Sequence, residues 1–276
     1  MPGTLYICAT PIGNLSDMSE RFIETLKNVD IVAAEDTRHS LKLLNHLGIH
    51  KPMISYYEHN KRERGEVIIG KLSEGLDVAL VSDAGTPAIS DPGEELVAMC
   101  KDVGIEVIPI PGCCAAISAL SVSGLPTGRF CFEGFLTVNK QGRREHLESL
   151  KSEMRTMIFY EAPHKLLSTL RDMETSFGGD RRISLCRELT KLHEQTVRTT
   201  LSEAVAFYTE NQPKGEFVLI VEGATITEKT FDETPEEHLK RLVSEGMDKK
   251  EAIKTVAKER GIPKKEIYSM ALELGL

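Results

Sequence analysis

Residues 78–93 read VALVSDAGTPAISDPG, a short apolar run followed by a long loop of small and polar residues. The apolar residues 78–81 predict a buried strand, and the Gly, Pro, Ser and Asp residues after them predict a loop. The same pattern recurs at residues 5–15, LYICATPIGNL, and at residues 107–116, VIPIPGCCAA. Loops at the carboxyl ends of parallel strands form the ligand crevice of an open α/β sheet. The sequence therefore predicts an α/β fold whose binding site is built from several loops.

Residues 1–122 alternate such β-type runs with helical patterns, as a mostly parallel sheet requires. In the helical stretches, apolar residues recur at three- and four-residue spacing. The predicted strands are Leu5–Ala9, Ile31–Glu35, Met53–Tyr57, Val78–Val81 and Val107–Pro109, and the predicted helices are Glu20–Lys27, Ser40–Leu47, Glu63–Ser73 and Glu94–Lys101. We expect residues 1–122 to form one α/β lobe.

A second α/β lobe is expected over residues 123–224, after the break SGLPTG at residues 123–128. Its predicted strands are Phe130–Phe135, Met157–Tyr160, Ile183–Arg187 and Glu216–Val221, and its predicted helices are Lys140–Lys151 and His164–Thr175. Residues 225–234 are polar and unpatterned, which predicts a linker. Residues 235–276 form a helical tail, and its last two helices, separated by Gly261-Ile262-Pro263, resemble a helix-turn-helix. Most helical hairpins of this kind are only packing units.

The composition is that of an ordinary globular protein, with 276 residues, 41% hydrophobic and 28% charged, and a formal net charge of −8. This balance excludes fibrous and disordered classes of protein. The net acidity argues against indiscriminate nucleic-acid binding, because a polyanion must meet positive potential. Residues 138–155 and 180–198 each carry a net charge of +2, so an RNA surface would be a local face on an acidic body.

The sequence shows no sign of export, of a membrane span or of a disulfide framework. No basic start precedes an apolar stretch at the N-terminus, and no window approaches the roughly 20 apolar residues that a span requires. The six cysteines lack C-x-x-C spacing and most lie in apolar runs, which predicts buried thiols in a reducing compartment. We expect a cytoplasmic protein without a membrane partner or a metal site.

A cluster of ionisable residues, Glu35-Asp36-Thr37-Arg38-His39, closes the second predicted strand. Such groups could perform acid–base chemistry or position a substrate. Metal binding is disfavoured because adjacent residues on an extended end point in opposite directions. The structural alternative is that Asp36 and Arg38 form a pair that caps the next helix. In the second lobe, Arg143-Arg144 and Arg181-Arg182 could contact phosphates or form ordinary exposed basic faces.

Taken in order along the chain, eight segments are shared with a known family: TPIGNL, EDTR, SDAGTPAISDPG, PIPG, FEGFL, IFYEAPH, RELTK and KGE. Together they resemble the tetrapyrrole methylase superfamily of S-adenosylmethionine-dependent methyltransferases. The likeness covers residues 4–224 almost continuously and is greatest for the branch that methylates a cytidine ribose 2′-hydroxyl in 16S ribosomal RNA. Residues 235–276 resemble the C-terminal helix-turn-helix of that branch.

The resemblance implies a two-lobed fold, a homodimer, and S-adenosylmethionine held between the lobes by several separate loops. It explains why no G-x-G-x-x-G follows the first predicted strand and why the chain has no P-loop. The implied cofactor contacts are Pro11, Asp83, Gly85, Thr86, Cys114, Ala115, Tyr160 and Leu189. Where relatives often have Ser after PIPG, this chain has Cys113-Cys114, which leaves hydrogen bonding there to the backbone.

The implied partner is 16S rRNA in the 30S subunit, whose ribose hydroxyl is a poor nucleophile until its proton is removed. The candidates for the general base are Glu35 and Asp36, and those for stabilising a phosphate or the alkoxide are Arg38 and Lys191. The expected RNA contacts are Arg143, Arg144, Arg181 and Arg182. Two alternatives stay open: a corrin-precursor C-methyltransferase on the same fold, and a non-catalytic ribosome-assembly factor with a vestigial cleft.

Overall fold

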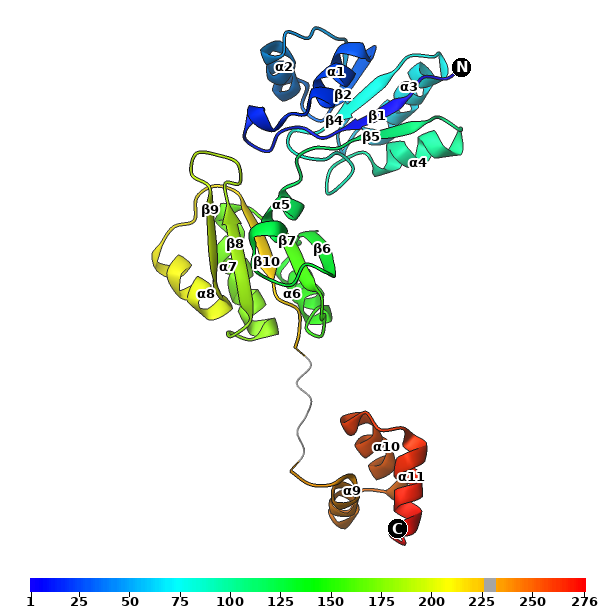
Figure 1. Ribbon diagram of the computed structural model, residues 1–276, viewed down its shortest axis with the longest axis vertical. Helices are drawn as coiled ribbons and strands as arrows, with labels where there is room; N and C mark the ends of the chain where they lie inside the picture. The colour runs from blue at the N-terminus through cyan, green and yellow to red at the C-terminus, as the bar shows by residue number, and fades with distance from the viewer. Residues whose placement is uncertain (226–231) are drawn as a thin grey trace. The chain divides into compact units, whose positions relative to one another are not determined.

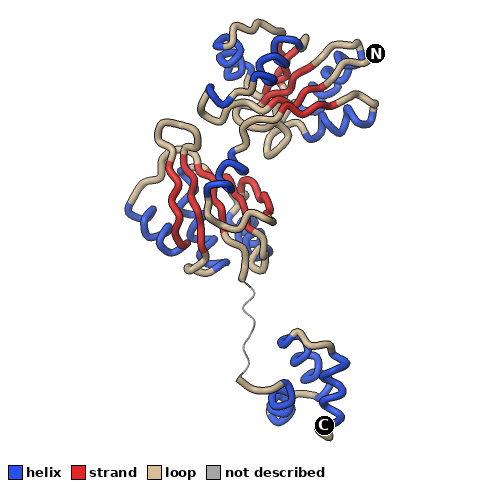
Figure 2. Tube along the Cα trace, viewed as in Figure 1, coloured by secondary structure: helices blue, strands red, loops and turns tan. Residues whose placement is uncertain are grey.

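The computed structural model describes residues 1–225 and 232–276. It divides into two compact units, Met1–Ala224 and Thr225–Leu276. The first unit holds two five-stranded sheets, each with its own helices (Figures 1 and 2). Most of the predicted linker, residues 226–231, lies outside the described residues.

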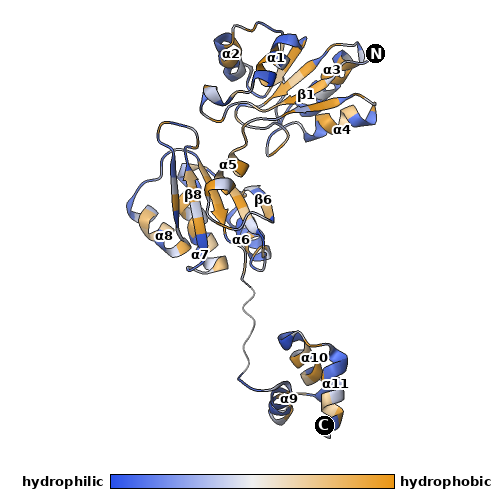
Figure 3. Ribbon diagram, in the orientation of Figure 1, coloured by the Kyte–Doolittle hydropathy of each residue, from blue (hydrophilic) through white to orange (hydrophobic). Residues whose placement is uncertain are grey.

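The first sheet is parallel throughout and has the strand order β3-β2-β4-β1-β5. Its strands are β1 (Leu5–Cys8), β2 (Ile31–Ala34), β3 (Met53–Ser55), β4 (Val78–Val81) and β5 (Val107–Ile110). The accompanying helices are η1 (Leu15–Asp17), α1 (Glu20–Asn28), α2 (Thr37–His46), α3 (Lys61–Ser73) and α4 (Glu94–Asp102). One face packs against α1 and α2, and the other against α3 and α4. Both faces are covered, which is why β4 is apolar at every position (Figure 3).

The second sheet is mixed and has the strand order β6-β7-β10-β8-β9, with only β6 and β7 parallel. Its strands are β6 (Phe130–Phe135), β7 (Thr156–Glu161), β8 (Arg182–Arg187), β9 (Gln195–Thr200) and β10 (Phe217–Val221). Its helices are α5 (Ala115–Val122), α6 (Lys140–Ser149), α7 (Pro163–Phe177) and α8 (Leu201–Glu210). Along β10, Leu219 packs toward α6–α8, whereas its neighbours Val218 and Ile220 pack toward α5. Strand alternation thus buries both faces.

The α/β class and the two-lobed arrangement are confirmed, with three local differences. Helix α5 packs on the second sheet, although its residues come before the predicted second lobe. Helix α2 begins at Thr37, three residues earlier than predicted, because the Asp36 carboxylate accepts a hydrogen bond from the Arg38 backbone N–H at 2.8 Å. Strand β9 and helix α8 are absent from the elements predicted from the sequence, since β9 is a polar strand at the sheet edge.

The second unit contains the helices α9 (Pro235–Ser244), α10 (Lys249–Arg260) and α11 (Lys264–Glu273). They enclose a hydrophobic core of their own, which includes Leu239, Ile253 and Ile267. Thr234 and Glu237 form a capping box at the start of α9, and Gly261 takes a left-handed conformation at the end of α10. None of the described helices has the length and apolarity needed to cross a membrane.

Candidate functional site

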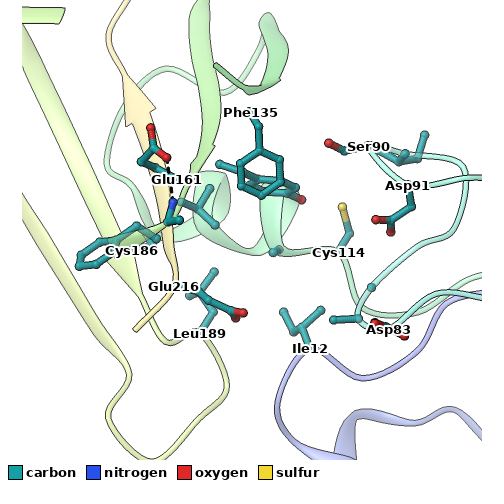
Figure 4. Close-up of a pocket in the computed structure, with 18 of the residues that line it drawn as sticks. Ile12, Asp83, Ser90, Asp91, Cys114, Phe135, Glu161, Cys186, Leu189 and Glu216 are labelled. Carbon is teal, nitrogen blue, oxygen red and sulfur yellow. Dashed lines mark hydrogen bonds between the residues drawn. The ribbon is translucent and has the colours of Figure 1, made fainter. Parts of the chain in front are cut away.

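A cavity of about 480 Å³ lies in the first unit and is lined by both lobes (Figure 4). The first lobe contributes Glu35 from the end of β2 and, from the loop after β4, residues 83–86 and 89–91. The second lobe contributes residues at the end of β7, at the start of β10 and in the loop after β8. The predicted crevice at the carboxyl ends of the first sheet is therefore present, and the second lobe encloses it.

Hydrogen bonds join the loops around the cavity to one another. Thr10 and Gly85 exchange two backbone hydrogen bonds, at 2.8 and 3.1 Å, and the Thr86 hydroxyl donates to the carbonyl of Cys113 at 3.0 Å. In the described chain, every non-glycine residue with a positive φ lies in two of these loops: Ala88, Ser90, Glu188 and Thr190. Strained backbone of this kind concentrates where a ligand must be held.

The first-lobe side of the cavity carries the carboxylates of Glu35, Asp83 and Asp91. Burial raises the pKa of Glu35, and the neighbouring carboxylates of Asp83 and Asp36 raise it further. Burial also raises the pKa of Asp91, to about 6, and the Glu35 carboxylate adds to this effect. Like charges held close together in a partly dehydrated site favour the binding of a cation.

The second-lobe side carries an aromatic group built around Tyr160. The Tyr160 ring meets Phe132 and Phe135 edge-on, with centroid distances of 5.1 and 5.4 Å. Its hydroxyl accepts a hydrogen bond from the backbone N–H of Ala116 at 3.2 Å, which satisfies a free donor in the first turn of α5. Burial raises the pKa of Tyr160 to about 12, so the phenol stays neutral. This wall presents flat apolar surface to the cavity.

Lys191 is the cationic side chain among the described residues that line the cavity. Its Nζ lies 3.0 Å from Glu188 Oε1 and 2.9 Å from Glu216 Oε2. Burial alone would lower the pKa of Lys191, but its hydrogen bonds to the two carboxylates outweigh burial and raise it. A Cβ atom at Gly13 would come within 2.4 Å of the Lys191 side chain, so a first-lobe loop and a second-lobe loop meet here.

The lining residues fit S-adenosylmethionine. A cavity of about 480 Å³ falls within the ~300–1,000 Å³ typical of small-molecule sites. Five carboxylates and one ammonium line it, an excess of negative charge that suits a sulfonium cation. The Tyr160 wall and the apolar Leu189 offer surface for a flat base. Over the described ranges, no group of three His, Cys, Asp or Glu residues is placed to hold a metal.

The structure gathers most of the predicted cofactor residues at this cavity: Asp83, Gly85, Thr86, Cys114, Ala115, Tyr160 and Leu189. Pro11 does not line it. The Thr10–Gly85 bridge fixes the loop so that Ile12 reaches the cavity, while Pro11 lines a neighbouring groove. The cavity is also lined by Asp91, Phe135 and Glu216, which the sequence did not single out although each lies in one of the quoted motifs.

The four catalytic candidates occupy different environments. Glu35 and Lys191 line the cavity, whereas Asp36 and Arg38 do not. Asp36 caps α2 and pairs with the Arg38 guanidinium at 2.8 Å, as the structural alternative proposed. These hydrogen bonds from Arg38 hold the pKa of Asp36 well below its usual range. The Arg38 side chain is 89% exposed and lies outside the cavity.

The four arginines that were expected to contact RNA also lie in different environments. Arg143 is buried, and its guanidinium donates two hydrogen bonds to the Asp172 carboxylate. The prediction that Arg143 contacts RNA is therefore corrected, because its charge is paired in the protein interior. Arg144 is exposed and donates to the same carboxylate at 3.1 Å. Arg182 is exposed and paired with Glu222, while Arg181 is partly buried against the Phe177 ring.

Replacing Asp91 with Asn is expected to raise the melting temperature at pH 7.5 and to leave it unchanged near pH 4. The folded pKa of about 6 exceeds the unfolded value of about 3.9, so the folded state binds more protons between these values. Stability attributable to Asp91 is therefore greatest below pH 4 and falls as the pH rises through 6. Asn avoids this loss. Calorimetric scans of both proteins from pH 4 to 8 measure the melting temperatures. A difference in melting temperature that does not change with pH would contradict the prediction.

Comparisons with known proteins place this geometry in context. The sequence profile of the Tetrapyrrole (Corrin/Porphyrin) Methylases matches residues 4–205. The chain is 51% identical to a Synechocystis protein called Ribosomal RNA small subunit methyltransferase I, over 99% of this chain and 98% of that one. Proteins of the same name from Halalkalibacterium halodurans and Escherichia coli O157:H7 are 52% and 46% identical, covering 97% and 98% of this chain and 94% and 95% of their own.

Solved structures resemble the fold at much lower identity. Uroporphyrin-III-C-methyltransferase from Thermus thermophilus superposes with a TM-score of 0.57 at 17% identity, covering 79% of this chain and 94% of its own. A diphthine synthase superposes with a TM-score of 0.61 at 12% identity, covering 80% of this chain and 90% of its own. These likenesses establish the two-lobed fold alone.

Proposed function

This chain belongs to the tetrapyrrole (corrin/porphyrin) methylase family, as its motifs predicted, and we propose that it methylates the ribose 2′-hydroxyl of a cytidine in 16S rRNA with S-adenosylmethionine. One observation carries the proposal. Relatives called Ribosomal RNA small subunit methyltransferase I share 46–52% of their residues with it over nearly its whole length, the helical tail included. The solved structures that resemble the fold leave about a fifth of this chain unmatched.

When bound, S-adenosylmethionine supplies a methyl group that is already activated for transfer. The residues around the cavity must then hold the attacking oxygen in line and keep water out. Tyr160 and its neighbouring rings close one side, and the loop contact between Gly13 and Lys191 joins the lobes beside it. Positioning of this kind can account for several kcal/mol of the barrier.

Of the two candidate bases, we assign removal of the proton from the 2′-hydroxyl to Glu35. Its carboxylate lines the cavity, and its raised pKa makes it a better proton acceptor near neutral pH. Asp36 is held by Arg38 and has a lowered pKa, so it is the weaker base. Lys191 stays protonated at the cavity edge and is the candidate to stabilise developing negative charge. Arg38, which is exposed and pairs with Asp36, is the candidate for a phosphate contact.

The remaining RNA contacts are assigned to exposed arginines and to the tail. Arg144, Arg181 and Arg182 lie in the two segments of locally positive charge, and Arg144 and Arg182 are solvent-exposed. The unit Thr225–Leu276 has its own core, so it can serve as an RNA-binding module. We also propose a homodimer: Ile117 and Val122 on α5 are 50% and 41% exposed, which offers apolar surface to a second copy.

The experiment that tests the function is transfer of tritium from labelled S-adenosylmethionine to 30S subunits from cells lacking this gene. We expect the label in 2′-O-methylcytidine after nucleoside analysis. A chain ending at Ala224 should bind the cofactor equally well but require more 30S for half-maximal transfer. Label in a corrin precursor instead would keep the fold and overturn the function. No cofactor binding by calorimetry would indicate a non-catalytic assembly factor.

A further inference from the structure

A second hollow adjoins the cofactor cavity in the first lobe. This groove has a volume of about 230 Å³ and lies between the loop after β1 and helix α2. Thr10, Pro11, Gly13 and Leu15 line it from the loop, and His39, Lys42, Leu43 and His46 line it from the helix. Asp83 lines both the groove and the cavity, so the two hollows meet at that residue.

The helix side of the groove is a single stripe of side chains. Residues 39, 42, 43 and 46 follow three- and four-residue spacing, which places them along one face of α2. The stripe carries one ammonium and two imidazoles, and His39, Lys42 and His46 are all exposed. Asp83 is the carboxylate that lines the groove, at the junction with the cavity. The groove therefore lacks the carboxylate excess of the cofactor cavity, and Lys42 offers a cation to an anionic group of a ligand.

The groove also contains a polar group without a partner in the protein. Ser40 lines it and is 3% exposed, and its hydroxyl oxygen makes no hydrogen bond. Buried polar atoms in folded proteins are nearly always paired, and an exception calls for an explanation such as a bound ligand, an ordered water or a functional role. A hydroxyl can both donate and accept, so it suits the sugar or the base edge of a nucleotide.

The size of the groove limits the ligand to one small unit. At about 30 Å³ per water molecule, 230 Å³ holds roughly eight waters. That space accommodates one sugar–base unit. An RNA strand would reach it with its phosphates toward the exposed Lys42 and its ribose toward Asp83, beside the Glu35 carboxylate.

We propose that this groove is the subsite for the target nucleotide: Ser40 binds its sugar or base, Lys42 binds its phosphate, and the ribose hydroxyl is delivered to the cofactor cavity at Asp83. The assignment rests on the proposed methylation of RNA and adds the residues that select and place the substrate. It also gives the EDTRHS segment a role beyond capping α2, because Ser40 and His39 belong to it.

The test uses the full-length protein and a fluorescein-labelled 16S rRNA fragment that contains the target cytidine, with S-adenosylhomocysteine present. Lys42→Ala is expected to weaken RNA binding about fivefold or more and to reduce the slope of log affinity against log salt by about 1. Lys101→Ala, at a lysine on α4 that is also exposed, is the matched control and should change neither quantity. Cofactor affinity, measured by calorimetry, should stay within about twofold in both variants.

Ser40→Ala is the second variant, since it removes only a hydroxyl that has no partner in the protein. It should raise KM for 30S severalfold and leave the melting temperature undiminished. Unchanged RNA affinity and KM in both Lys42→Ala and Ser40→Ala would overturn the proposal. An equal loss of cofactor affinity would assign the groove to the cofactor instead. RNA binding is measured without turnover, so failure of the wild-type protein to methylate 30S would count against the proposed function separately.

Discussion

Replacing Glu35 with Gln is expected to lower kcat for methyl transfer about 10²- to 10⁴-fold, the range for loss of a positioned general base. The side chain keeps its size, but an amide cannot take the proton of the ribose hydroxyl. Cofactor affinity should change little, because the Asp83 and Asp91 carboxylates remain. Single-turnover methylation of 30S subunits gives the rate, and calorimetry gives the cofactor Kd.

The pH profile separates a proton acceptor from a residue that only shapes the cavity. The wild-type rate should rise with pH through the raised pKa of Glu35, because only the ionised carboxylate accepts a proton. The residual rate of the Glu35→Gln variant should lack this rise. Asp36→Asn is the matched control, since an Asn oxygen still caps α2, and it should keep kcat within about threefold. A larger loss in Asp36→Asn than in Glu35→Gln would transfer the assignment to Asp36.

Replacing Arg143 with Ala is expected to lower the free energy of unfolding by up to about 3–5 kcal/mol, since it leaves the buried Asp172 carboxylate with only the hydrogen bond from the exposed Arg144. The Arg143 and Asp172 side chains are 9% and 7% exposed and lie 2.6 Å apart. Burial would raise the pKa of Asp172, but hydrogen bonds from Arg143 and Arg144 outweigh it and lower the pKa. The stabilisation is therefore complete above about pH 4, the unfolded pKa, and is lost as the pH falls through the folded pKa.

Urea denaturation at pH 7.5 measures the effect. Arg144→Ala, whose side chain is 56% exposed, is the control and should cost no more than about 1 kcal/mol. The double variant Arg143→Met with Asp172→Leu should recover most of the loss, because it removes both buried charges together. An Arg143→Ala protein that is as stable as the wild type but binds RNA more weakly would restore the original prediction for Arg143.

The local patterns of the sequence predicted much of the site. The apolar run of β4 predicted that the loop after it takes part in the binding site, and the family resemblance selected Asp83, Gly85 and Thr86 within that loop, all of which line the cavity. Glu35 was identified by its position at the end of β2, which the parallel sheet brings beside β4. Such inferences succeed because strand alternation and loop chemistry depend on neighbouring residues.

The sequence by itself determined the α/β class, the parallel first sheet, the family, and the loops that converge on the cofactor. Tertiary structure alone decided that α5 belongs to the second sheet, that Pro11 lines the groove while Ile12 lines the cavity, and that Arg143 is buried. The reason is the range of the interactions. A strand or loop follows from residues a few positions apart, whereas the environment of Arg143 depends on Asp172, 29 residues away, and that meeting exists only once the chain has folded.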